Sequence, residues 1–237
     1  MNKKFAFTLA EVMIAVSIIG ILTAATVPSV MYNYQKKTQT LLLKKTYVNL
    51  TDNLDRYKSE QGINAVPYMD EGKIKKFIED NYNNYKYCAN TTSCFSSNYK
   101  SLSGTTKSFS VSNGYGAVLK DDVAIYIKPA TIPDGWAYSR TCVGSNCYMK
   151  YDAYSNKKIA TVYVDVNGTK PPNIGGRDMF TFNIYGDYSI DVVSPSTIKA
   201  GTAATNRTTL YSNNCLSSPF GTGCLGKILN DNWEMNY

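Results

Sequence analysis

The stretch that decides the fold is FTLAEVMIAVSIIGILTAATVPSV, which occupies residues 7–30. No charged residue occurs from position 12 to position 35, and the segment is rich in Ile, Val, Ala and Met. A helix rises about 1.5 Å per residue, so roughly 20 residues cross the hydrocarbon layer and this segment is long enough to span a membrane. Glu11 stands at its beginning, although a carboxylate within lipid costs several kcal/mol. The sequence therefore predicts a membrane-spanning helix whose one charge needs a separate explanation.

The residues before this segment decide whether it is an anchor or a cleaved secretory signal. Lys3 and Lys4 form a short positive flank, which would remain on the cytoplasmic side. A general secretory signal would have a brief apolar core and a cleavage site of small residues, a part that Ala24 and Ala25 could play. The apolar run, however, continues past them to Pro28 and beyond. We therefore predict an anchor with a short basic leader.

The leader carries a recognisable motif. The residues AFTLAE at positions 6–11, followed by the long apolar helix and Pro28, resemble the leader of type IV pilins and type II secretion pseudopilins. The resemblance implies that a prepilin peptidase cuts between Ala6 and Phe7 on the cytoplasmic side and methylates the new amino terminus at Phe7. Glu11 matches the acidic residue of the family and Pro28 its helix-kinking proline. The family usually has glycine before the cut; Ala6 is small enough that we expect cleavage to be retained.

The same resemblance explains Glu11. In an assembled filament of this family the N-terminal helices form a central bundle, where the Glu11 carboxylate can pair with the positive amino terminus of a neighbouring subunit. A lone buried charge is expensive, whereas a paired and hydrogen-bonded charge is tolerable. Such a pair would also favour one axial register between subunits. The simpler alternative, that Glu11 lies among the lipid headgroups, describes the unassembled protein.

The residues after the membrane segment predict that the helix continues. Leu43, Tyr47, Leu50, Leu54 and Tyr57 recur at steps of four and three residues, which is the pattern of an amphipathic helix. Gly62 follows as a C-cap. We predict one helix over residues 7–61 that is kinked near Pro28, with a membrane and filament-core half at 7–30 and an amphipathic half at 31–61.

The remaining sequence, residues 62–237, predicts a globular head that follows the cleaved leader, residues 1–6, and the helix. Residues 70–84 have helical spacing, whereas residues 116–128 read as a hairpin with Asp121 and Asp122 at the turn. The segments 159–166, 179–184 and 187–193 add further strands. The predicted class is α+β, with the long kinked helix packed on an antiparallel sheet as the resemblance to pilins also implies. Residues 164–182 and 223–237 resemble recurrent segments of pilin-like proteins.

The six cysteines fall into three local pairs. None of the pairs has CxxC spacing, and the chain has no histidine, so a zinc site would need four thiolates from separate loops. An even number of cysteines behind a membrane segment favours disulfides in an oxidising compartment, although six cysteines allow fifteen connectivities and local pairing is only a preference. The predicted pairs are Cys88 with Cys94, Cys142 with Cys147, and Cys215 with Cys224.

One loop has the composition of a calcium site. Asp165, Asn167 and Asp178 flank a turn at Gly168 between two predicted strands, and calcium accepts six to eight oxygen ligands in flexible geometry. Major pseudopilins carry calcium in a comparable region, which strengthens the hypothesis by resemblance. The alternative is a turn in which Asp165 and Asn167 bond to their own backbone, with Asp178 near Arg177 at the surface.

The function predicted first is structural. The chain would be a subunit of a type IV pilus or pilus-like filament, a homo-oligomer assembled from the bacterial inner membrane by an assembly ATPase and a platform protein. The resemblance implies an extracellular pilus or, alternatively, a periplasmic pseudopilus that acts in protein export.

Two alternative functions are a binding subunit at the filament tip and an enzyme. The 20 tyrosines and the net charge of +7 would allow a minor tip subunit that binds DNA or a surface, because base stacking and phosphate attraction need only rings and cations, but nothing places these residues on one face. An enzyme is disfavoured because the chain lacks histidine, and the adjacent carboxylates of Asp121 and Asp122 would point in different directions.

Overall fold

The computed structural model describes residues 8–61, 69–83, 85–131, 140–143, 146–149 and 156–237. The chain divides into two compact units, Met1–Thr38 and Gln39–Tyr237, which are described in turn. The helix α1, Leu9–Gln61, contributes to both units. The predicted C-cap Gly62 lies outside the described residues.

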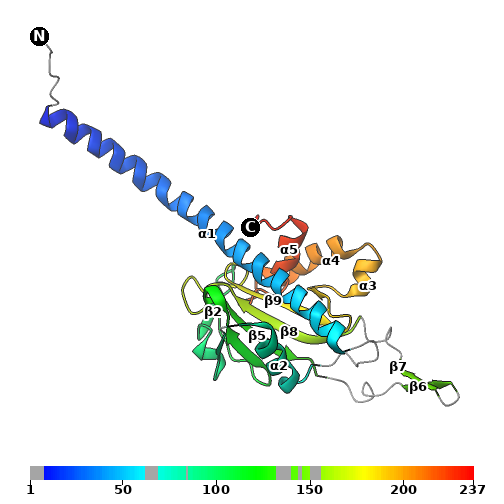
Figure 1. The fold of residues 1–237 in the computed structure, drawn as a ribbon. Helices are drawn as coiled ribbons and strands as arrows, with labels where there is room; N and C mark the ends of the chain where they lie inside the picture. Colours follow the sequence, from blue (N-terminus) through cyan, green and yellow to red (C-terminus); the bar gives the residue numbers. More distant parts are fainter. Residues whose placement is uncertain (1–7, 62–68, 84, 132–139, 144–145, 150–155) are drawn as a thin grey trace, which may run out of the picture. The chain divides into compact units, whose positions relative to one another are not determined.

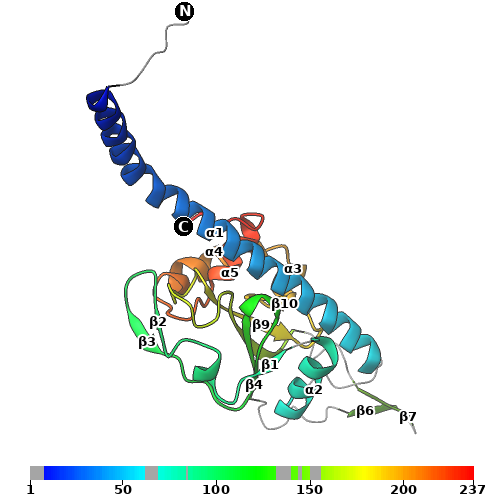
Figure 2. The ribbon, with the colours of Figure 1, turned by 60° about the vertical axis from the view of Figure 1, so that its left-hand side comes forward.

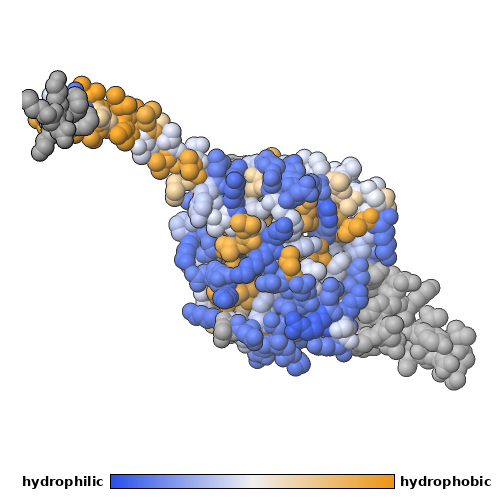
Figure 3. Space-filling model, turned by 45° about the horizontal axis from the view of Figure 1, so that its top comes forward, coloured by the Kyte–Doolittle hydropathy of each residue, from blue (hydrophilic) through white to orange (hydrophobic). Residues whose placement is uncertain are grey.

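The first unit consists of the beginning of α1. The helix continues through Pro28 without a break in its assignment, so the proline lies inside a continuous helix. Large apolar side chains along this part are exposed, and Figure 3 shows them gathered on the helix. Within the described residues one helix is long and apolar enough to cross a membrane, with a mean hydropathy of 2.1 in its most apolar window. This agrees with the predicted membrane-spanning half.

The second unit is built on an antiparallel sheet of six strands in the order β1-β4-β5-β8-β9-β10. The predicted hairpin and both clear strands are confirmed, because β4 pairs with β5 and β8 pairs with β9, each antiparallel. The strands are β1 Lys86–Tyr87, β4 Tyr115–Val118, β5 Ala124–Pro129, β8 Lys158–Asp165, β9 Met179–Tyr185 and β10 Ile190–Asp191. The turn between β4 and β5 is a short 3₁₀ segment, Lys120–Asp122.

The second half of α1 covers one face of this sheet (Figures 1 and 2). Leu43, Leu50 and Leu54 are fully buried against the apolar side chains of the central strands. The Tyr47 hydroxyl donates a hydrogen bond to the Ile190 carbonyl at 2.8 Å and so ties the helix to the edge strand β10. The predicted amphipathic stripe is therefore the core-facing side of the helix.

A second short helix closes the same face of the sheet. Helix α2, Glu71–Asn81, begins where the Asp70 side chain accepts a hydrogen bond from the Lys73 N–H at 2.8 Å, which is an N-cap. Its apolar face buries Ile74, Phe77 and Ile78. The helix predicted over residues 70–84 is thus confirmed with a shorter C-terminal end.

The opposite face of the sheet is covered by loops and a small ribbon. The strands β2, Asn98–Lys100, and β3, Thr106–Ser108, pair with each other, and a 3₁₀ turn occupies Thr91–Ser93. Tyr99 and Phe109 from this region pack with Tyr126 of β5 in a second, aromatic cluster. The separate hairpin of β6, Arg140–Val143, and β7, Asn146–Met149, is described by its backbone.

The C-terminal segment is helical, which the sequence patterns did not predict. It comprises α3, Pro195–Lys199, α4, Ala203–Leu210, a π-helical turn, Tyr211–Cys215, and α5, Cys224–Asn230. Gly226 of α5 allows close approach to α4, since a Cβ atom there would lie 2.9 Å from the Cβ of Arg207. These helices bring Arg207 to the buried carboxylate of Asp191 on β10.

Candidate functional site

The N-terminus of α1 is closed by a capping box. The Thr8 N–H donates to Oε2 of Glu11 at 2.8 Å, and Oγ1 of Thr8 accepts from the Glu11 N–H at 3.2 Å. The two residues thereby satisfy each other's backbone donors at a helix end where no carbonyl is available. This cap was not among the roles predicted for Glu11, although the T-x-x-E spacing before an apolar run is itself a signal for it. Ala6 and Phe7, the predicted cleavage pair, lie outside the described residues.

Three hydroxyl groups within the apolar half of α1 are satisfied by the helix itself. Ser17 donates to the Met13 carbonyl at 2.8 Å, and Thr23 and Thr26 donate in the same way to carbonyls one turn earlier, at 2.7 and 2.9 Å. A hydroxyl bonded within its own helix can enter lipid or a helix bundle without leaving a donor unpaired. The segment therefore suits an apolar environment along its whole length.

The loop predicted to bind calcium contains two fully buried carboxylates. Asp165 accepts hydrogen bonds from the Tyr99 hydroxyl and from the Asn167 N–H, the latter at 3.0 Å. Asp178 accepts from the N–H groups of Asn173 and Ile174, both at 2.6 Å. The Asp165 contact confirms the backbone-bonded turn that was weighed as the alternative. The surface position considered for Asp178 is wrong, because this side chain is buried and organises the residues before it.

The electrostatics of this pair follow from its burial. Burial raises the pKa of Asp165 well above its usual range, and the charge of Asp178 adds to the shift. Burial likewise raises the pKa of Asp178 to about 6, although its backbone hydrogen bonds oppose the change. Because the two buried negative charges are unfavourable, the loop is stabilised when it binds a proton or a cation.

We predict that this loop makes stability fall as pH rises. Between pH 4 and pH 6 the folded protein holds a proton on Asp178 that the unfolded chain has released, because the ordinary value is 3.8 and the folded value about 6. The free energy of unfolding should then decrease by up to about 3 kcal/mol across this window from this group alone. Urea unfolding of the full chain in detergent and chelator, followed by near-ultraviolet circular dichroism, measures it.

The control for this prediction is Asp178→Asn. The variant loses one acceptor for the backbone N–H groups and should be less stable, yet its stability should depend less on pH over the same window. An equal pH dependence in both proteins would show that other groups cause it.

Two of the predicted disulfides are present in the described residues. Cys88 is bonded to Cys94, and Cys215 is bonded to Cys224. The bonds close the loop before β2 and join the π-helical turn to the first residue of α5. The register of β6 and β7 places Cys142 directly opposite Cys147, but the side chains of this third pair lie outside those described.

We expect the disulfide between Cys215 and Cys224 to add about 2–3 kcal/mol to the free energy of unfolding, because it closes a loop between residues nine positions apart. The double variant Cys215→Ala with Cys224→Ala should lower Tm by about 5–10 °C in a thermal scan. The matched control is Cys88→Ala with Cys94→Ala, whose smaller loop should give a smaller decrease. Equal stability of the first double variant and the parent would contradict the expectation.

The comparisons with known proteins agree with these features. Residues 1–27 match the family described as "Prokaryotic N-terminal methylation motif". The chain is 33% identical over 102 residues to "Type II secretion system core protein G" of Aeromonas hydrophila, which covers 35% of this chain and 71% of that relative. No solved structure matches the chain. With its methylation motif, its long apolar N-terminal helix, and its helix-covered antiparallel sheet, the chain belongs to the type IV pilin and type II secretion pseudopilin family.

Proposed function

We propose that this protein is a structural subunit of a helical filament, cleaved between Ala6 and Phe7, methylated at Phe7, and polymerised through α1. The observation that carries the proposal is the exposed apolar half of α1, which has its hydroxyls satisfied internally and a carboxylate at its N-terminus. Such a surface requires lipid or other helices around it. A homo-oligomer supplies the helices, and the bacterial inner membrane supplies the lipid before assembly.

Cleavage and assembly of the subunit would each require partner proteins. A prepilin peptidase would remove the leader, and an assembly ATPase with an inner-membrane platform protein would move each subunit from the lipid into the filament. In these steps the chain itself would act as a structural subunit, in keeping with its family.

Two filaments fit the proposal. The similarity to a core protein of type II secretion favours a periplasmic pseudopilus that acts in protein export. A type IV pilus on the cell surface uses the same leader and helix. Filament length distinguishes them, because a pseudopilus remains within the envelope whereas a pilus extends beyond it.

The test combines mass spectrometry with electron microscopy. The mature subunit purified from membranes should have the mass of a chain that begins with N-methyl-Phe7, and labelled subunit should be found in filaments. An intact Met1 in all of the protein, or the absence of the subunit from every filament, would refute the proposal.

Calcium at the buried acidic loop is a second part of the proposal. Two observations support it: the paired carboxylates of Asp165 and Asp178, and the buried side-chain oxygens of Asn167 and Asn173, which have no hydrogen-bond partner among the described residues. A carboxylate oxygen that accepts one hydrogen bond, from an N–H or from the Tyr99 hydroxyl, retains a second lone pair, so these four residues could ligate a cation while they hold the loop.

Calorimetric titration of the chelator-stripped full chain in detergent tests the calcium proposal. Binding should release protons near pH 6 and should reverse the pH dependence of stability expected for the metal-free protein, because a bound cation favours the ionised carboxylates. A flat trace at millimolar calcium would remove calcium from the proposal and leave the filament untouched.

A further inference from the structure

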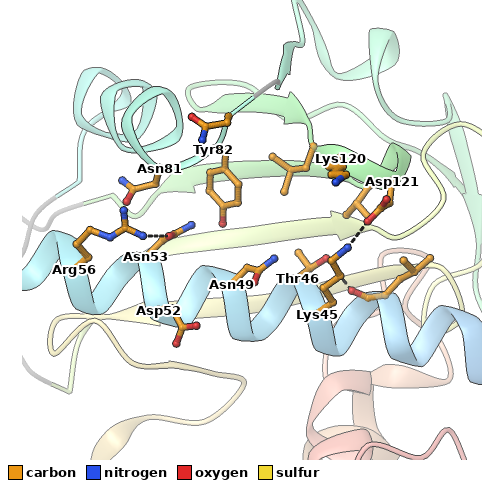
Figure 4. Close-up of a pocket in the computed structure, with 14 residues that line it drawn as sticks. Lys45, Thr46, Asn49, Asp52, Asn53, Arg56, Asn81, Tyr82, Lys120 and Asp121 are labelled. Carbon is orange, nitrogen blue, oxygen red and sulfur yellow. Dashed lines mark hydrogen bonds and ion pairs between the residues drawn. The ribbon is translucent and has the colours of Figure 1, made fainter.

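A polar cavity of about 350 Å³ opens between the second half of α1, the end of α2 and the turn between β4 and β5 (Figure 4). All of its walls belong to the unit Gln39–Tyr237. Its volume lies at the low end of the roughly 300–1,000 Å³ found for small-molecule sites. The cavity is separate from the apolar half of α1 and from the buried acidic loop, so neither of the functions described above uses it.

Four side-chain amides contribute to the wall of this cavity. Asn49 and Asn53 come from α1, and Asn81 and Asn83 come from the end of α2 and the residues after it. Asn53 is buried and its Oδ1 accepts a hydrogen bond from Nη2 of Arg56 at 3.0 Å, which fixes both side chains. An amide offers donors and an acceptor together, and this is the combination that a sugar hydroxyl, itself both donor and acceptor, requires.

The Tyr82 hydroxyl is an unused polar group in the same wall. Its oxygen is inaccessible to solvent and has no hydrogen-bond partner of normal geometry among the described residues, and Figure 4 shows it directed toward α1. Burial raises the pKa of Tyr82 to about 12, with the side chain of Asn53 opposing the shift, so the group remains a protonated donor at neutral pH. A buried hydroxyl without a hydrogen bond of normal geometry costs up to about 1–3 kcal/mol, a cost that a ligand's oxygen would reduce.

The lining of the cavity carries charges of both signs. It includes the cations Lys45, Arg56 and Lys120 and the carboxylates Asp52 and Asp121. Lys45 and Asp121 form an ion pair with each other, which leaves two cations and one carboxylate. A phosphate or a nucleic-acid backbone would meet the Asp52 carboxylate as well as the cations, whereas an uncharged polyhydroxylated ring would meet both as hydrogen-bond partners.

We propose that this cavity binds a sugar ring, as one unit of a glycan, with the Tyr82 hydroxyl and the asparagine amides as its hydrogen-bond partners. The filament subunit would then also be a carbohydrate-binding protein. This binding needs no assembled filament, because every wall of the cavity comes from one chain.

The experiment is saturation-transfer NMR on the full chain in a detergent without a sugar headgroup. The probes are glucose, galactose, N-acetylglucosamine and glucuronate at millimolar concentration, with inorganic phosphate as a competitor. At least one sugar should receive saturation, and phosphate should not displace it. Tyr82→Phe should weaken binding about tenfold with little loss of Tm, since the hydroxyl has no hydrogen bond of normal geometry among the described residues.

Two further variants make the result specific to the cavity. Asn49→Trp places an indole at an exposed position of the lining and should abolish saturation, whereas Tyr87→Phe changes an exposed tyrosine outside the cavity and should have no effect. The proposal is overturned if no sugar binds, if phosphate displaces the sugar, or if Asn49→Trp leaves binding unchanged. Loss of filaments in Asn49→Trp without any sugar binding would instead identify the cavity as a contact between subunits.

Discussion

Glu11→Gln should give a subunit that is cleaved and methylated but does not enter filaments. In the proposed bundle the Glu11 carboxylate is the partner of a neighbour's amino terminus, and removal of one partner from a buried ion pair costs about 3–5 kcal/mol. A cost of this size corresponds to incorporation more than about 100-fold weaker. The measurement compares subunit in membranes with subunit in sheared or purified filaments by quantitative immunoblotting.

Because Glu11 is also part of the capping box, Glu11→Gln tests the role of the charge more specifically than Glu11→Ala would. A glutamine at position 11 keeps a side-chain oxygen that can accept from the Thr8 N–H, so the helix end is preserved while the charge is lost. The matched control is Thr8→Ala, which removes the Oγ1 acceptor of the cap at a cost of about 1 kcal/mol but keeps the charge. Thr8→Ala should therefore assemble. Abundant normal filaments from Glu11→Gln, or equal failure of both variants, would contradict a role of the charge in setting the register.

Arg207→Ala should cause the largest loss of stability among single substitutions in the head. The Asp191 side chain is 2% exposed and is held by Nε and Nη2 of Arg207 together with the N–H groups of Val192 and Val193. Without the guanidinium, a carboxylate would be buried with no counter-charge, which costs about 3–5 kcal/mol. Tm of the full chain in detergent should fall by about 10 °C or more.

The control for Arg207 is an ion pair whose two side chains are exposed to water. Lys76 lies 2.9 Å from Asp80 on the exposed face of α2, and the two side chains are 75% and 53% exposed. Lys76→Ala should change the free energy of unfolding by less than about 0.5 kcal/mol. Arg207→Lys should lie between the two, because lysine keeps the charge but loses the two-pronged contact. A loss below about 1 kcal/mol in Arg207→Ala would show that solvent reaches Asp191 readily.

Periodicity made the long helix and the main strands predictable. The spacing of Leu43, Leu50 and Leu54 specifies the buried side of α1, and the alternation in β8 and β9 specifies a sheet. The strands β1 and β10 have two residues each, too few for any pattern to show. The C-terminal helices are short and rich in Thr and Asn, so their intrinsic propensity is low and tertiary contacts decide their structure.

The site residues show the same division between local and distant causes. The cap of Thr8 and Glu11 joins residues three positions apart, so their spacing in the sequence is enough to predict it. The pairing of Asp191 with Arg207 joins residues 16 positions apart, and no sequence pattern announces it. The alternative to a calcium site put Asp178 near Arg177 at the surface; the structure buries Asp178, which accepts from the N–H groups of residues 173 and 174.

The hydrogen bonds from Ser17, Thr23 and Thr26 to their own helix affect how easily the helix can move between lipid and protein. Since each hydroxyl donates one turn back along the helix, no hydrogen bond has to be exchanged when the helix passes from lipid to protein or returns. The passage replaces one set of dispersion contacts by another and changes little else. In the proposed filament these three hydroxyls would therefore oppose neither the entry of a subunit from the bilayer nor its return.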